Sequence, residues 1–298
     1  MKAKLVFAVA ACCSLLFSNM SLSSDVRQLP RHLWVDQVQD KSPPFMDREA
    51  FEKLVVNVLS YFDKYAAMNR ANITYEIFWD SSSTGAFTLR KDQGHTWHFF
   101  VYDGVLRLPY VTEDLISSIL CHEVGHHLGG YPFKENAWAA AEGQADYFAM
   151  HVCLPELFAR EPQKNVEYRD RSPLVLKRLC DESFADPIRR DVCYREAVAV
   201  ETMLKYEGSD GKVKLSLTNK DPLRVDTTYL LHPGAQCRID TAISGAMCSK
   251  SFKLGYVPGY FDKGQNTSKA ELDSNQFVCH GEGQLSSRPS CWYYPIVK

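Results

Sequence analysis

The chain has 298 residues, of which 45% are hydrophobic and 23% are charged, an ordinary composition for a globular protein with a sizeable core. The formal net charge is −2, so nothing in the charge balance indicates a polyanionic partner, and we expect no binding of nucleic acid. Length alone allows one or two domains.

The N-terminus, residues 1–24, has the pattern of a secretory signal peptide. Two lysines precede an apolar run at residues 5–17, which is too short to span a bilayer comfortably. We therefore predict export to the bacterial periplasm or out of the cell, with cleavage near Ser24. Lipidation at Cys12 and an uncleaved anchor are the alternatives. No other segment approaches transmembrane length, so we expect no integral membrane segment in the mature chain.

Cysteine usage also favours export. Two of the ten cysteines lie in the signal, and an even number in the rest of an exported chain indicates disulfides. A thiolate metal site is the rival interpretation, but the sequence contains no CxxC. Six cysteines form local couples and favour pairing between neighbours: Cys180 with Cys193, Cys237 with Cys248, and Cys279 with Cys291.

The first part of the mature chain predicts an extended segment, one helix and a small sheet. Residues 25–45 contain three prolines and little periodicity. Apolar residues at helical spacing then predict a helix over 47–68. The segments 73–79, 85–89 and 96–102 are rich in β-branched and aromatic residues, and turn-like stretches separate them, so they predict a small antiparallel sheet.

The remainder predicts mainly helix. Thr112 is a good N-cap for a helix that two glycines end at 129–130. Further helices are expected over 135–154, 187–206 and 234–248, with a surface connection at 207–222. The fold class is therefore α+β, mainly helical, with the small sheet before the first of these helices. Residues 25–250 form the main domain, and 251–298 form an irregular, cysteine-containing extension packed on it.

The stretch ILCHEVGHHLGG, residues 119–130, places three histidines and a glutamate in one predicted helix. His122 and His126 are four residues apart, so their imidazoles share one face and can bind a single Zn²⁺. Glu123 is placed to act as general base on the attacking water. His127 points about 100° away and is expected to pack or to support the site. Chance occurrence of HExxH in a buried helix is the alternative.

A catalytic zinc usually has three protein ligands, so a third must come from elsewhere. The extended pattern HExxHxxGxxH fails because residue 132 is proline. Glu142 and Asp146 are four residues apart in an otherwise apolar helix, where unpaired charges are costly. We expect Glu142 to be the third ligand and Asp146 to accept the outer N–H of a zinc-bound imidazole. The alternative is that both carboxylates face solvent.

Together, SSILCHEVGHHLGG and AEGQADYFA resemble the corresponding segments of M48-type zinc metallopeptidases, gluzincins that carry HExxH on one helix and ExxxD on the next. The resemblance covers about residues 100–240 and implies a zincin-like fold. It assigns the zinc ligands to His122, His126 and Glu142, the catalytic glutamate to Glu123, and the supporting acid to Asp146.

A further segment, LHPGAQCRI at residues 231–239, resembles the family pattern THPPxxxRI, with departures at Leu231 and Gly234. By this resemblance His232 is a catalytic candidate that stabilises the oxyanion, or a plug of the open metal position. Its alternative is a turn residue before a helix. Arg238 is expected to support the site by pairing with a buried carboxylate.

The resemblance implies an exported zinc-dependent endopeptidase with one zinc per chain, acting on peptides or on unfolded and misfolded proteins. Strand 96–102 is expected beside the cleft, where an extended peptide could add to its edge. The alternative function is a catalytically inactive or plugged envelope chaperone or scaffold that keeps a zinc site. A purely structural zinc would need a fourth ligand, for which His232 is the candidate. The tail after Cys248 lies outside the common pattern and leaves the substrate open.

Overall fold

The structure is a computed structural model that describes residues 43–135, 138–209, 211, 213–281 and 283–297. The chain divides into two units, Met1–Leu33 and Trp34–Lys298. The first unit lies outside the described residues, as does the predicted signal peptide at 1–24. All that follows concerns the second unit.

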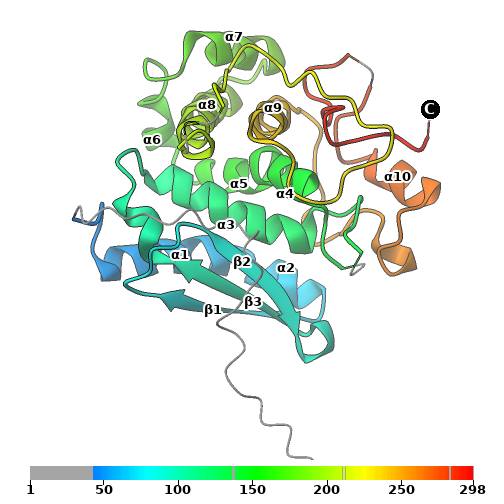
Figure 1. Ribbon diagram of the computed structural model, residues 1–298, viewed down its shortest axis with the longest axis horizontal. Helices are drawn as coiled ribbons and strands as arrows, with labels where there is room; N and C mark the ends of the chain where they lie inside the picture. Colours follow the sequence, from blue (N-terminus) through cyan, green and yellow to red (C-terminus); the bar gives the residue numbers. More distant parts are fainter. Residues whose placement is uncertain (1–42, 136–137, 210, 212, 282, 298) are drawn as a thin grey trace, which may run out of the picture. The chain divides into compact units, whose positions relative to one another are not determined.

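The fold is α+β, with helices predominating over a single three-stranded sheet in the described residues (Figure 1). The strands are β1 (Asn72–Phe78), β2 (Ala86–Lys91) and β3 (Thr96–Tyr102). The longer helices are α1 (Arg48–Tyr61), α3 (Glu113–Leu128), α7 (Leu174–Ser183), α8 (Pro187–Glu207) and α9 (Ala235–Ala246). Short helices are α2 (Asp63–Met68), α4 (Glu142–Phe148), α5 (Leu154–Phe158), α6 (Pro162–Val166) and α10 (Ser268–Ser274). Single turns are η2 (Asp92–Gly94), η3 (Asp103–Arg107), η4 (Ala149–Cys153) and η5 (Tyr260–Asp262).

The sheet is mixed, so the expectation of an antiparallel sheet is wrong. The strand order is β1-β3-β2, with β3 antiparallel to β2 and parallel to β1. An antiparallel meander would have placed β2 in the centre. Instead β3 takes the centre, because its sequence TWHFFVY is the most apolar of the three and a central strand is the most buried position. Within the described residues, the unpaired edge beside the site therefore belongs to β2, and β3, as the central strand, has no edge to offer a peptide.

Helix α3 lies between the sheet and the helices α4, α8 and α9 (Figure 1). Thr112 caps it by accepting a hydrogen bond from the Leu115 amide at 3.1 Å. Most of its side chains are buried, including His122, His126 and His127. A helix enclosed on both sides excludes water from its polar residues, so the histidines must find partners inside the protein.

The helix expected over 135–154 starts later than its sequence indicates. Residues 131–135 and 138–141 belong to no helix, and this segment is here called the 131–141 loop; its Phe133 and Ala140 form a β-bridge. The amide of Ala140 donates to the carbonyl of His126, at the end of α3. These tertiary hydrogen bonds override the helix propensity of the alanines, and α4 begins only at Glu142. Its continuation is the π-helical turn η4.

Four disulfides connect the eight cysteines of the second unit: Cys121–Cys153, Cys180–Cys193, Cys237–Cys291 and Cys248–Cys279. Among the expected neighbour couples, only 180 with 193 is confirmed. The other two couples are wrong, because the last two disulfides tie the C-terminal tail to α9 and its end. Cys121–Cys153 links α3 to η4, so it joins the two segments that carry the predicted metal ligands.

Removal of the Cys121–Cys153 disulfide by a double Cys→Ala substitution should destabilise the protein. The bond closes a loop with a sequence separation of 32. Its loss should lower the free energy of unfolding by about 4 kcal/mol through the entropy of the unfolded chain. Urea unfolding measures this value. The shorter Cys180–Cys193 loop is the matched comparison, with about 3 kcal/mol expected; an unchanged unfolding free energy for the 121/153 variant would contradict the prediction.

Residues 251–297, where described, pack into the same core as the rest of the second unit and include α10, which their composition did not predict. Trp292 is fully buried against Gly143, so close that a Cβ at position 143 would lie 2.3 Å from its ring. The Trp292 carbonyl also accepts from the Tyr229 amide at 2.7 Å. The tail thus supports both the start of α4 and the segment before His232. In the described part of the chain, no helix has the length and apolar character needed to cross a membrane.

Candidate metal centre

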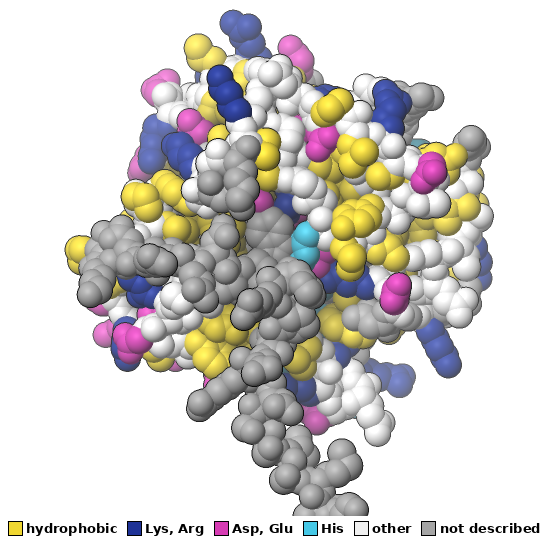
Figure 2. All heavy atoms as spheres, viewed as in Figure 1, with side chains coloured by type: hydrophobic (Ala, Val, Ile, Leu, Met, Phe, Trp, Pro, Cys, Tyr) yellow, Lys and Arg dark blue, Asp and Glu magenta, His cyan; other side chains and the backbone are white. Residues whose placement is uncertain are grey.

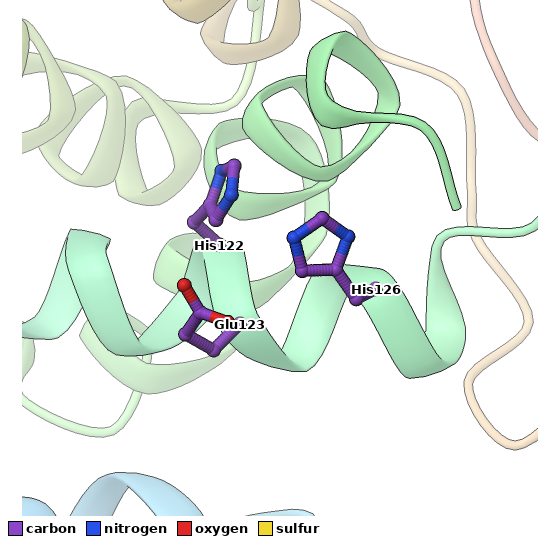
Figure 3. A group of neighbouring side chains, drawn as sticks. All are labelled: His122, Glu123 and His126. Atoms are coloured by element: carbon purple, nitrogen blue, oxygen red, sulfur yellow. The ribbon is translucent and has the colours of Figure 1, made fainter. Parts of the chain in front are cut away.

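The histidines and the glutamate of HExxH lie on one side of α3. Figure 3 shows the imidazoles of His122 and His126 rising from the helix with the Glu123 side chain beside them. The two rings are edge to face, with centroids 4.8 Å apart. One ligand atom from each of the three residues lies within 4.8 Å of the others, so all three can face the same small volume.

The outer nitrogen of each imidazole is fixed by a hydrogen bond. His122 Nδ1 lies 2.7 Å from Asp146 Oδ1, and His126 Nδ1 lies 2.9 Å from the carbonyl oxygen of Ala140. Both partners are acceptors, so each ring donates its Nδ1–H outward. This leaves Nε2 of both rings directed toward the interior of the site, as in metal-binding histidines whose other ring nitrogen donates to a carboxylate or a backbone carbonyl.

Glu142 brings a carboxylate oxygen to both imidazoles. Its Oε2 lies 3.0 Å from His122 Nε2 and 3.5 Å from His126 Nε2. Glu142 is the first residue of α4, and its side chain is 2% exposed. The structure therefore brings together all three residues predicted to bind zinc, although they come from two helices.

His232 and Lys134 approach the same carboxylate. His232 Nε2 lies 3.0 Å from Glu142 Oε2, and its ring is nearly parallel to that of His122 at a centroid distance of 6.4 Å. Lys134, on the 131–141 loop, forms an ion pair with the other oxygen, Oε1. Oε2 of Glu142 thus faces three imidazoles, while Oε1 faces a lysine ammonium.

Asp146 and Arg238 form a buried ion pair behind His122. The Arg238 guanidinium donates to Asp146 Oδ2 at 2.8 Å and to Oδ1 at 2.6 Å, and also to Glu207 Oε1 at 2.6 Å. All three side chains are almost completely buried. A bidentate arginine restricts the orientation of a carboxylate, so Arg238 fixes Asp146, which in turn fixes the ring of His122.

These contacts shift the pKa values of the ligand residues. Burial alone would lower the pKa of His122, but the Asp146 and Glu142 carboxylates outweigh it and raise the pKa to about 10. Burial would likewise raise the pKa of Glu142, yet His126 and His122 hold it well below its usual range. Burial places the pKa of His126 well below its ordinary value. In the site, the Glu142 carboxylate thus lies beside the neutral imidazole of His126 and the cationic imidazole of His122.

Glu123 lies next to a small cavity. Burial raises the pKa of Glu123 to about 8, against the neighbouring charge of His122, which lowers it. The cavity has a volume of about 40 Å³, whereas one water needs roughly 10–15 Å³. Its walls are mostly apolar and include Leu115, Ile119 and Met203, and the Arg238–Glu207 pair lines it as well.

Three other groups of the site could not be identified from the sequence: the Lys134 and Glu207 side chains and the Ala140 carbonyl. Lys134 lies two residues after Pro132, the residue at which the extended zinc-binding pattern fails. Nothing in the sequence around Lys134 indicates a contact with Glu142. Glu207 was assigned to a surface connection, but it ends α8 and its side chain is buried on Arg238. The Ala140 carbonyl is a backbone acceptor that no residue pattern could identify.

The residues present fit a divalent metal ion. Two Nε2 atoms and one carboxylate oxygen converge, and nitrogen and oxygen donors of this kind suit Zn²⁺ and several neighbouring transition metals. The raised pKa of His122 shows that the site favours positive charge, which a metal supplies when it displaces a proton. A second grouping, Asp221 with Cys237 and Cys291, fits no metal because both cysteines are disulfide-bonded.

The surface shows no charge of one sign gathered in a patch on the face drawn in Figure 2, as far as its described residues extend. A histidine side chain is visible near the centre of that face, with hydrophobic side chains to its right. Comparisons with protein-family models, curated proteins and solved structures found no match for this chain.

Proposed function

We propose that the chain is an exported zinc-dependent endopeptidase of the M48 type, with a zincin-like fold and one zinc per chain. The observation that carries this proposal is the convergence of His122 Nε2, His126 Nε2 and Glu142 Oε2, with both Nδ1–H groups bonded outward. A helical pair of histidines without a function would not need two rings held by outward Nδ1–H hydrogen bonds and a buried carboxylate between them.

The bound zinc would polarise both a water molecule and the carbonyl of the scissile peptide bond. Glu123 takes a proton from the attacking water and later delivers it to the leaving amine. A general base works best with a pKa near the working pH, and burial already raises that of Glu123 toward neutrality. Asp146 and Arg238 keep His122 in its binding orientation. His232, 22% exposed beside Glu142, is the side chain placed to donate to the developing oxyanion.

The cavity and the edge strand beside Glu123 favour an extended peptide as the substrate. β2 is an edge strand of the described sheet, and its first residue, Ala86, lines the cavity next to Glu123. An extended peptide can therefore pair with β2 through main-chain hydrogen bonds and place an apolar side chain in the cavity. Unfolded or misfolded proteins supply such extended, apolar segments. Four disulfides agree with a protein of an oxidising compartment outside the cytosol.

The alternative proposal is a zinc-containing chaperone or scaffold without peptidase activity. It is favoured by the position of His232, whose Nε2 faces the same oxygen as the two predicted histidine ligands and could plug the open metal position. The presence of Glu123 beside the site favours the enzyme.

Metal removal separates the two functions. The purified wild-type chain should contain one zinc, measured by plasma mass spectrometry, and should cleave an unfolded reporter protein. Treatment with a chelator should abolish cleavage, and added zinc should restore it, since the water and the carbonyl lose their activating cation. Full cleavage by metal-free protein would exclude the proposed mechanism. A zinc-loaded chain that binds the reporter but cleaves none of it would favour the scaffold.

A further inference from the structure

Arg90 is a half-buried cation beside the proposed site that the chemistry does not use. It lies on β2, on the same side as Thr88, because alternate residues of a strand share a face. That side is turned toward α3, since the Thr88 hydroxyl lies 2.7 Å from His127 Nε2 and the Arg90 Nε–H donates to His127 Nδ1 at 3.3 Å.

His127 does not neutralise this cation. Thr88 donates its hydroxyl hydrogen to the His98 carbonyl, so it accepts the Nε2–H of His127, and Nδ1 is left as the acceptor for Arg90. Because Nδ1 accepts a hydrogen bond from Arg90, it carries no proton, and the ring is neutral. His127 therefore orients the guanidinium without adding a charge.

Three aromatic rings surround the guanidinium carbon of Arg90. The distances to the ring centroids are 5.5 Å for Trp97, 5.0 Å for Trp138 and 5.6 Å for Tyr260. Nη1 also donates weakly to the Tyr260 hydroxyl at 3.4 Å. Cation–π contacts of this kind offset part of the free-energy cost of burying the guanidinium. They involve the faces of the rings, however, and do not supply acceptors for the N–H groups of the arginine.

Within the described residues, Arg90 has no carboxylate partner, and its Nη2 has no hydrogen bond. Arg195 and Arg238, which are also withdrawn from solvent, each pair with two carboxylates. Buried charges are normally paired, because an uncompensated one is costly. Arg90 lies next to the proposed peptide-binding cleft. An unpaired cation at this position indicates that its anionic partner belongs to a bound ligand.

The position of Arg90 along β2 relates this anion to the cleavage site. Ala86, at the start of the strand, lines the cavity beside Glu123. Arg90 is four residues further on, about 13 Å away at the rise of a strand and on the same face. A peptide paired with β2 would place one side chain in the cavity and another, two to four residues away, beside Arg90.

We propose that Arg90, together with Trp138 and Tyr260, binds a carboxylate of the peptide substrate. This inference rests on the proposed function and adds a substrate class to it: peptides with an apolar residue in the cavity and a carboxylate two to four residues away. The carboxylate belongs either to an aspartate or glutamate side chain or to the C-terminus of the peptide. A planar guanidinium matches a carboxylate with two parallel hydrogen bonds.

The test uses the full-length chain with Glu123→Gln and bound zinc, so that peptides bind without being cleaved. Matched peptides carry Glu or Gln two, three or four residues from an apolar residue, each with a free or an amidated C-terminus, and calorimetry measures their affinities. At one spacing, Glu should bind about tenfold more tightly than Gln, or the free C-terminus about tenfold more tightly than the amide. The first result assigns the subsite to an acidic side chain, and the second to a terminal carboxylate.

Variants of the same protein then identify the residue. Adding Arg90→Gln should abolish the preference, and Arg90→Lys, which keeps the charge, should retain part of it. Arg171→Gln, an exposed arginine that lies over the Tyr168 ring, is the control and should retain all of it. Absence of any preference, absence of peptide binding, or a preference that survives Arg90→Gln would overturn the inference. If the zinc-loaded wild type cleaves no peptide, the proposed function fails, while the binding data still decide the role of Arg90.

Discussion

Glu123→Gln should lower the turnover number for peptide cleavage by about 10²–10⁴-fold and leave the zinc content unchanged. The substitution removes the proton acceptor but preserves the shape of the side chain. Glu123 is not needed as a ligand, because His122, His126 and Glu142 already supply three donors. Steady-state cleavage of an unfolded reporter and metal analysis of the same preparation measure the two quantities.

Glu113→Gln is the matched control for this variant, because it makes the same chemical change on the same helix at a half-exposed position. Its activity should equal that of the wild type. Cleavage by Glu123→Gln within a few-fold of the wild type would exclude Glu123 as the base. Loss of zinc from Glu123→Gln would instead assign the residue to metal binding, and the ligand set would have to be revised.

Glu142→Ala should abolish stable zinc binding and, with it, cleavage. Removal of Asp146, which only orients His122, should cost about 10–100-fold in zinc affinity, as for other outer partners of zinc ligands. Loss of a direct ligand should cost more than that. Competition with a chromophoric chelator measures the affinities of Glu142→Ala and Asp146→Ala in parallel.

Glu196→Gln controls for the loss of a buried glutamate, since Glu196 is fully buried and pairs with Arg189, outside the candidate metal groups of the described residues. It should bind zinc like the wild type. If Glu142→Ala keeps wild-type zinc affinity, the third ligand is another residue, and His232 becomes the first candidate because its Nε2 lies in the same grouping.

Elements defined by local pattern could be predicted from the sequence. Helix α3 was expected with its N-cap at Thr112, because capping and apolar periodicity depend on neighbours in the chain. The i,i+4 spacing likewise places His122 and His126 on one face. Glu142 could be selected because a carboxylate in an apolar helix needs a partner.

Features set by distant contacts could not be predicted. The strand order depends on which strand the helices bury most deeply, and a meander has the same local pattern as the observed mixed sheet. The late start of α4 depends on hydrogen bonds from the 131–141 loop to α3. Two of the disulfides join α9 and the residues at its end to the tail. The spacing of cysteines in the sequence does not indicate which of them lie close together in the fold. The positions of Lys134 and Glu207 at the site likewise depend on contacts between distant segments of the chain, so they could not be predicted from the sequence.

The support that Trp292 gives to Gly143 and Tyr229 has a consequence for biosynthesis. The ligand helices leave the ribosome well before the tail, but the face of α4 next to Glu142 stays uncovered until Trp292 has been made and Cys291 has joined Cys237. A nascent or prematurely terminated chain would hold every residue of HExxH and ExxxD without the packing that fixes them. Under the proposed function, the site would therefore not become hydrolytic before Cys291 and Trp292 have been made.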